Sequence, residues 1–143
     1  MIDRYVVDAN IVIQRLIVEQ DTPQVKILFN QMISGTALVV PEFCRLECTN
    51  VLWKQVRFQG MPADVAEGLL VQLIALPLTV MEIQYLMPRS LQIGLRCELV
   101  AIYDSIYIAM AERLDCALIT IDRRQANAAR SLGVKLKPIG DFK

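Results

Sequence analysis

Short, largely apolar runs separated by stretches of helical character constrain the fold of this chain more than any other feature. The runs lie at residues 4–7, 37–40, 78–82 and 117–120, and each holds β-branched residues. Strands that are apolar along their length are typical of parallel sheets covered on both faces. The sequence therefore predicts a three-layer α/β/α fold with a mostly parallel central sheet of four or five strands, the fifth being an edge strand at 134–138.

Helix start and stop signals assign most of the remaining chain to seven helices. Asn10 is a candidate N-cap for a helix over 11–20. Thr22 and Pro23 begin the next helix, which ends at Gly35. The chain shows no internal repeat, and its length suits one domain over residues 1–143. The other helices are expected at 42–58, 61–76, 91–98, 104–114 and 123–132.

Composition narrows the chemistry that the chain can perform. It contains no histidine, which excludes Ser-His-Asp triads, Cys-His pairs and His-ligated zinc sites. Its 15 Lys and Arg balance 15 Asp and Glu, so a strongly basic nucleic-acid clamp is not expected. Catalysis by this chain must therefore depend on carboxylates, Lys, Tyr, Cys or a hard metal ion.

Three carboxylates stand at or near the ends of expected strands. Asp8 directly follows the first strand, Asp122 follows the 117–120 strand, and Asp104 begins a helix one element earlier. Ligands of open parallel sheets bind beyond the carboxyl ends of the strands, so these acids are expected in one crevice. Asp104 and Asp122 also suit helix capping, whereas an acid directly after a buried strand, such as Asp8, needs a partner.

Glu47 joins this group because of its neighbours. It is expected inside the helix over 42–58, where capping is not available, and Phe43 and Val51 make its stripe apolar. Asn50 adds a polar neighbour, and no Lys or Arg is evident on the stripe. The stripe therefore favours an inward-facing Glu47 that needs a cation, with a surface glutamate as the alternative.

Four acids in one pocket predict a bound divalent cation. Two unit charges about 4 Å apart repel by roughly 4 kcal/mol at an effective dielectric constant of 20. Ligands that are all oxygen select Mg²⁺ or Mn²⁺ over zinc or copper. A site of this kind suits metal-assisted hydrolysis of phosphodiesters, in which the metal activates water and neutralises developing charge.

Three segments together carry a family resemblance that spans nearly the whole chain: VVDANIVIQ, PEFCRLECTNVLWK and AIYDSIYIAMAERLDCALITIDRR. They resemble the signature blocks of the PIN-domain nucleases, and most closely the VapC-type ribonuclease toxins of type II toxin–antitoxin pairs. One departure is Asp115-Cys116, where many relatives have Gly, which affects a turn and leaves the acids in place. The resemblance implies RNA cleavage with one or two Mg²⁺ or Mn²⁺ ions at Asp8, Glu47, Asp104 and Asp122, supported by Asn10 and Thr120.

Roles within this set follow from the chemistry. Asp8 and Asp104 are expected as direct metal ligands, and Glu47 and Asp122 as ligands of a second ion or as groups that hold water. The leaving oxygen must be protonated by water or stabilised by a metal, because the chain has no histidine. Candidates for phosphate contacts, with a solvated helix face as the alternative, are Arg123, Arg124 and Arg130.

The sequence also predicts partners and a compartment. Hydrophobic residues make up 55% of the chain, and their surplus in 69–76 and 86–99 predicts a homodimer. The resemblance likewise implies a dimer, and an antitoxin protein that places a basic side chain near the acids. The first residues lack the apolar core of a signal peptide, and the apolar stretch 69–81 is too short to span a bilayer. A cytoplasmic protein with reduced cysteines and no membrane contact is expected.

Other functions remain open or fit poorly. A non-cleaving binding module of the same fold, and a stand-alone RNA-processing enzyme without an antitoxin, both remain possible. A phospho-acceptor receiver domain fits poorly, because no Asp follows the strand at 37–40. A dinucleotide oxidoreductase fits less well still, because no GxGxxG follows any expected strand.

Overall fold

Four strands form one parallel sheet in the computed structural model, which describes residues 3–143. The strand order is β3-β2-β1-β4, so β1 is central, and its Val6 pairs with Val39 of β2 and with Leu118 of β4. This confirms the predicted fold class, with four strands, while residues 1 and 2 of the expected domain lie outside the described range. The strands are β1 (Arg4–Val7), β2 (Ala37–Pro41), β3 (Thr79–Met81) and β4 (Ala117–Ile119).

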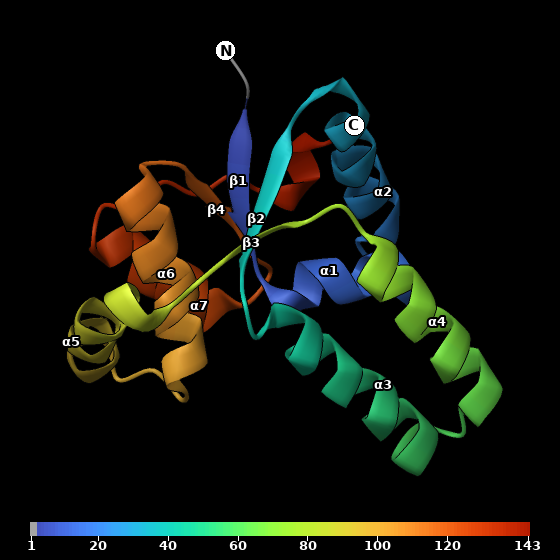
Figure 1. Ribbon diagram of the computed structural model, residues 1–143. Helices are drawn as coiled ribbons and strands as arrows, with labels where there is room; N and C mark the ends of the chain where they lie inside the picture. Colours follow the sequence, from blue (N-terminus) through green and yellow to red (C-terminus); the bar gives the residue numbers. More distant parts are fainter. Residues whose placement is uncertain (1–2) are drawn as a thin grey trace.

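Helices cover both faces of the sheet, as Figure 1 shows. Neighbouring residues of β1 serve the two layers, because Val7 packs into one buried core and Val6 into the other. The layer on the Val7 side holds α1 (Ala9–Leu16), α2 (Thr22–Asn30), α3 (Cys44–Gln59) and α4 (Ala63–Ala75), with the 3₁₀ turns η1 (Gln31–Ser34) and η3 (Ile139–Asp141). The layer on the Val6 side holds η2 (Gln84–Leu86), α5 (Met87–Cys97), α6 (Ile102–Leu114) and α7 (Arg123–Ser131).

The helices differ greatly in how much of them is buried. Every residue of α6 from Ser105 to Ala111 is buried, so this helix is fixed along two turns. In contrast, α3 and α4 form a hairpin that extends away from the sheet (Figure 1), and Leu73 is the one buried residue of α4. Arg45 of α3 donates to the Leu76 carbonyl at 2.6 Å and joins the two helices near the sheet.

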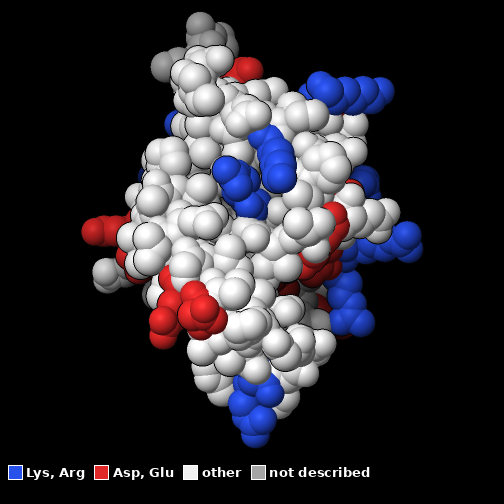
Figure 2. Space-filling model, turned by 90° about the vertical axis from the view of Figure 1, so that its right-hand side faces the viewer, with Lys and Arg blue, Asp and Glu red and all other residues white. Residues whose placement is uncertain are grey.

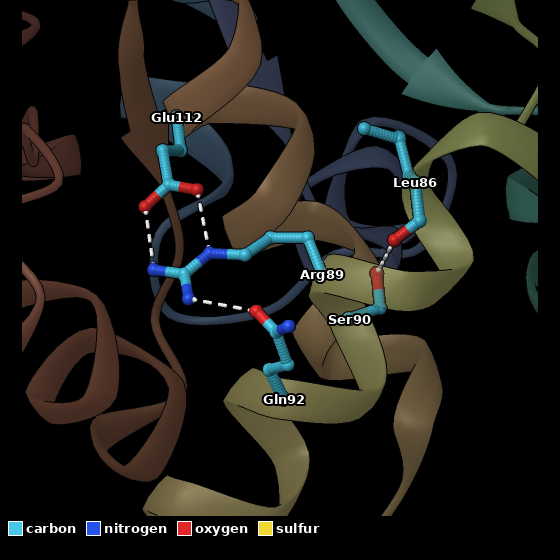
Figure 3. A network of polar contacts seen from close by, with 5 residues as sticks. All are labelled: Leu86, Arg89, Ser90, Gln92 and Glu112. Carbon is cyan, nitrogen blue, oxygen red and sulfur yellow. Dashed lines mark hydrogen bonds and ion pairs between the residues drawn. The ribbon is translucent and has the colours of Figure 1, made fainter.

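A polar network holds α5 against α6 (Figure 3). Arg89 donates to both carboxylate oxygens of Glu112, at 2.8 and 2.9 Å, and also to Gln92 at 3.4 Å. The Ser90 hydroxyl donates to the Leu86 carbonyl at 2.7 Å and anchors the first turn of α5. Both ends of the Arg89–Glu112 pair are about one-third exposed, so the pair contributes orientation more than stability.

Two helix starts differ from the prediction. The N-cap of α1 is Asp8 and not Asn10, because the Asp8 carboxylate accepts the Ile11 backbone N–H. That helix also ends at Leu16, four residues before the predicted end. Helix α5 begins four residues before the expected start at 91, with a proline in its first turn, where the missing N–H has no helical partner to lose.

The predicted fifth strand at 134–138 is wrong. The segment makes an isolated bridge between Leu136 and Leu118, in which the Lys135 carbonyl accepts the Leu118 N–H and the Lys137 N–H donates to the Leu118 carbonyl. Pro138 follows directly and has no N–H to continue the ladder.

Among the described residues, no helix has both the length and the apolar character needed to cross a membrane.

Candidate active site

All four predicted carboxylates lie at the N-terminal ends of helices. Asp8 and Asp122 are the N-caps of α1 and α7, while Glu47 and Asp104 lie in the first turns of α3 and α6. Strands β1, β2 and β4 lead into α1, α3 and α7 at one edge of the sheet, which is why these helix ends converge (Figure 1). The positive ends of the helix dipoles partly offset the charge gathered there.

Thr120 joins the two acids at the strand ends. Asp8 is 4% exposed, and its carboxylate accepts the Ile11 N–H at 3.0 Å and the Thr120 hydroxyl at 2.5 Å. The same hydroxyl oxygen accepts the backbone N–H of Asp122 at 3.0 Å. The end of β4 therefore fixes both the side chain of Asp8 and the backbone of Asp122.

The capping role foreseen for two acids is present in one of them. The Asp122 carboxylate accepts the backbone N–H groups of Arg124 and Gln125, at 2.8 and 3.2 Å. Asp104 lies three residues after the N-cap of α6, and that helix has no side-chain cap. The buried Gln125 amide donates to the Asp104 carbonyl at 3.2 Å and so links α7 to α6.

Glu47 is held by a residue that the sequence analysis missed. Tyr107 of α6, 1% exposed, donates its hydroxyl hydrogen bond to the Glu47 carboxylate at 2.8 Å. The signal was its spacing, since Tyr107 lies three residues after Asp104 and on the same side of the helix. The expected place of Glu47 in a helix interior was wrong, because α3 begins at Cys44 and puts Glu47 in its first turn.

Burial and neighbouring charges make ionisation of Asp8, Asp104 and Glu47 unfavourable. Burial raises the pKa of Asp8 to about 6; the hydrogen bonds from Thr120 and Ile11 oppose this, and the charges of Asp122 and Asp104 add to it. Burial also raises the pKa of Asp104, and the charge of Asp122 raises it further.

Glu47 is affected in the same way. Burial raises its pKa, the Tyr107 hydrogen bond opposes the rise, and the charge of Asp104 adds to it. The four acids thus form one electrostatic group, called here the carboxylate cluster. None of the ion pairs between side chains of residues 3–143 includes a member of the cluster.

The donor set of the carboxylate cluster fits a hard divalent cation. Its ligands are all oxygen, and no Lys or Arg neutralises them among the described ion pairs. Within residues 3–143, no three Asp, Glu or Cys side chains lie close enough to enclose a metal ion. A hard cation such as Mg²⁺ does not require such a group, because it is commonly held by one or two carboxylates together with water and substrate phosphates.

The other predicted site residues lie on the same helices as Asp8 and Asp122, and not all of them lie at the helix end that holds the acid. Asn10 is exposed in the first turn of α1, while Arg123 and Arg124 are exposed in the first turn of α7, next to Asp122. Arg130 lies in the last turn of α7, where it donates to Asn127, so the structure does not bring it to the acids.

An open hollow of about 470 Å³ between α5 and α7 is lined partly by Arg96 and Arg124.

Comparison with known proteins places these features in a family. The sequence pattern of the PIN domain matches residues 5–131. No curated protein matches the sequence. The structure of PAE2754 from Pyrobaculum aerophilum is similar with a TM-score of 0.72 and 20% identity, over 99% of this chain and 94% of that chain.

Two toxin–antitoxin structures are also similar. VapBC2 from Rickettsia felis, bound to a DNA fragment from its promoter, gives a TM-score of 0.69 at 11% identity, over 94% of this chain and 98% of that chain. FitAB bound to a DNA fragment gives 0.58 at 14% identity, over 94% of each chain. At these identities, the structural likeness shows a shared fold.

Proposed function

This chain belongs to the PIN-domain family, and on that premise we propose that it is a ribonuclease that hydrolyses RNA phosphodiester bonds with Mg²⁺ or Mn²⁺. The observation that carries the proposal is the carboxylate cluster. Its four acids come from four separate helix ends and repel one another. A group of acids whose ionisation is unfavourable is best explained by a bound cation, because a nearby positive charge favours the ionised form.

The proposed roles follow from the contacts of each side chain. Asp8 and Asp104 hold the first cation, and Glu47 and Asp122 hold a second ion or orient water. A divalent cation at this place lowers the pKa of water and neutralises charge on the phosphate. Thr120 orients Asp8, and Tyr107 orients Glu47. The phosphate contacts are assigned to Arg123 and Arg124, which directly follow Asp122.

The test is cleavage of structured and unstructured RNA with Mg²⁺, with Mn²⁺ and with excess EDTA. We expect cleavage with either metal and none with the chelator. Cleavage that persists unchanged in EDTA would contradict the metal requirement. Absence of cleavage with both metals, on both kinds of RNA, would instead favour a non-cleaving module of the same fold.

We further propose that the protein is the toxin of a type II toxin–antitoxin pair. The support is the fold shared with the VapBC2 and FitAB structures. An antitoxin segment with a basic side chain at the carboxylate cluster would replace the cation electrostatically. Co-expression with the product of a neighbouring small gene is expected to relieve growth arrest and RNA cleavage. If growth arrest and RNA cleavage both persist, the stand-alone RNA-processing enzyme is favoured.

For either role we propose a reducing cytoplasm as the compartment, because the four cysteines are free.

Exposed apolar residues support a homodimer. Val71 and Ile74 of α4 are 69% and 63% exposed, and Leu91 and Leu95 of α5 are 56% and 73% exposed. The two groups lie on opposite sides of the sheet (Figure 1), so a single two-fold contact covers one of them. The face that includes α4 is mostly uncharged (Figure 2).

Light scattering of the parent and of Ile74→Glu and Leu95→Glu tests this proposal. We expect the parent to give twice the chain mass of 16.2 kDa. A charge introduced at the dimer contact should give the monomer, while the same charge on the other face should have no effect. A parent that scatters as a monomer at micromolar concentration would contradict the proposal.

A further inference from the structure

An open hollow of about 400 Å³ adjoins the carboxylate cluster. Its walls come from the first turn of α1, the exposed side of α3 and the first turn of α6. Glu47 belongs both to this hollow and to the cluster, so a molecule bound in the hollow lies beside the acids. The volume falls within the range of small-ligand sites. The lining residues that carry the inference are Asn10, Phe43, Leu46, Glu47, Asn50 and Tyr103.

Aromatic and aliphatic side chains give the hollow a firm apolar wall. Tyr103 is 51% exposed and Leu46 is 71% exposed. The Tyr103 ring packs edge-on against Phe43 with centroids 5.1 Å apart, and Phe43 packs in turn against the buried Tyr107 at 5.8 Å. Tyr103 is thus an aromatic ring that is held by its neighbours and remains half open to a ligand. Such rings are the surfaces on which unpaired nucleobases stack.

Two amides complete the lining. Asn10 and Asn50 are both exposed, one at the start of α1 and the other on α3. Each amide presents donors and an acceptor, the combination that pairs with the edge of a nucleobase. A stacking ring with amides beside it recognises a flat heterocycle that carries both donors and acceptors. A phosphate alone would find no cation among the lining residues.

The position of Tyr103 connects this recognition to the chemistry. Tyr103 directly precedes Asp104 in the first turn of α6, so the ring and the carboxylate are one residue apart. A nucleotide whose phosphate reaches the cluster can therefore place its base in the hollow. We propose that the hollow binds the base of a nucleotide flanking the scissile bond in single-stranded RNA, with Tyr103 stacking on the base and Asn10 and Asn50 selecting it. This inference rests on the proposed ribonuclease function.

A kinetic cycle between protein and substrate tests the assignment. The substrates are a short single-stranded RNA and a series that replaces one nucleotide at a time by an abasic one. For the parent, one abasic position next to the cleaved bond should lower kcat/KM about tenfold, since stacking contributes that much. Tyr103→Ala should lower kcat/KM for the intact RNA by the same factor. An abasic nucleotide at that position should then lower kcat/KM of this variant no further. Tyr103→Phe keeps the ring and should behave as the parent.

Tyr85→Ala is the matched control. Tyr85 is 46% exposed, and its ring lies under Arg113 in the last turn of α6, at the opposite end of that helix from Tyr103. Its removal should leave every abasic penalty unchanged. Binding without chemistry is measured in EDTA, with 2-aminopurine at the sensitive position. The parent and Tyr103→Phe should quench its fluorescence by stacking, and Tyr103→Ala should not.

The outcomes separate this inference from the proposed function. If the parent cleaves RNA but the abasic penalties are the same in Tyr103→Ala, the ribonuclease function stands and the base site is wrong. If the parent neither cleaves RNA with Mg²⁺ or Mn²⁺ nor binds it in EDTA, both are wrong. If Tyr103→Ala only prevents inhibition by an antitoxin, with RNA kinetics unchanged, the hollow docks protein and the base assignment is overturned.

Discussion

The two acids at strand ends and the two acids in first helical turns share one site but are held in different ways. The junction carboxylates, Asp8 and Asp122, accept backbone N–H groups and cap their helices. The first-turn carboxylates, Glu47 and Asp104, make no capping hydrogen bond in α3 and α6. A capping acid gives its helix an acceptor for free N–H groups even without a ligand, whereas a half-buried acid that caps nothing makes no such contribution. The comparison indicates that stability and function should separate cleanly in the first-turn pair.

The largest expected effect is on RNA cleavage when a first-turn carboxylate is neutralised. Asp104→Asn should lower the rate by about two orders of magnitude or more, since charge stabilisation by a metal is worth several kcal/mol. It should also relieve repulsion worth about 1 kcal/mol after screening, which raises the Tm of the metal-free protein by about 3 °C. Cleavage assays and differential scanning with and without Mg²⁺ measure both.

Asp64→Asn provides the control for this prediction. Asp64 also lies in a first helical turn, that of α4, but it is exposed at the far end of the α3–α4 hairpin. Its neutralisation should leave cleavage and the response to Mg²⁺ as in the parent. An equal stabilisation by Mg²⁺ in the parent and in Asp104→Asn would remove Asp104 from the metal site.

The next effect concerns pH and the junction carboxylate Asp8. Its pKa is raised from 3.8 to about 6 in the folded protein, so the folded state binds more protons than the unfolded state between these values. The metal-free protein should therefore become more stable as pH falls from 7 through 6, by about 1 kcal/mol at pH 5 and about 3 kcal/mol below pH 4. Urea unfolding in EDTA at these pH values measures the change.

Asp8→Asn is the matched variant for the pH series. Asn keeps an oxygen that can cap α1 but removes the titrating group. Much of the pH dependence should then disappear, and what remains belongs to Glu47 and Asp104, whose pKa values are raised in the same direction. If the parent instead loses stability on going from pH 7 to pH 5 in EDTA, the raised pKa of a buried Asp8 without a neutralising cation is contradicted.

The smallest effect separates capping from charge. Asp122→Ala removes the acceptor for the N–H groups of Arg124 and Gln125, so the metal-free protein should lose about 1 kcal/mol. Asp122→Asn keeps a capping oxygen and should lose little. Asp104→Ala should show no comparable loss, because Asp104 caps nothing. Equal destabilisation by Asp104→Ala and Asp122→Ala would break the distinction between the two pairs of acids.

Much of the fold was predictable because its signals are local. The apolar runs located all four strands, and Gly35 and Gly60 mark helix ends where the backbone is left-handed. The lack of a strand at 134–138 was not predictable, because it depends on a tertiary contact. The segment pairs with Leu118 through two backbone hydrogen bonds, which form an isolated bridge and not a strand. Asp8 as the cap of α1 was missed because Asn10 is an equally good capping residue in the sequence.

The candidate site was predictable in its acids and not in their supports. Strand ends and an apolar stripe identified the four carboxylates. Tyr107 and Gln125 escaped notice because each acts across the structure, Tyr107 on Glu47 and Gln125 on the Asp104 carbonyl. These contacts join residues 60 and 21 positions apart, and the one local signal for them is the spacing of Tyr107 three residues after Asp104. Whether the acids bind metal together stays a prediction.

The hydrogen bond between Thr120 and Asp8 has a consequence for synthesis of the protein. It joins residues 112 positions apart, and β1 likewise pairs with β4, which is synthesised long after it. A chain still being translated holds Asp8, Glu47 and then Asp104 before Thr120 and Asp122 exist, so the acids cannot be fixed together until β4 and Thr120 have been synthesised. If the proposed ribonuclease function holds, the nascent chain would be inactive beside the messenger that encodes it until β4 is in place.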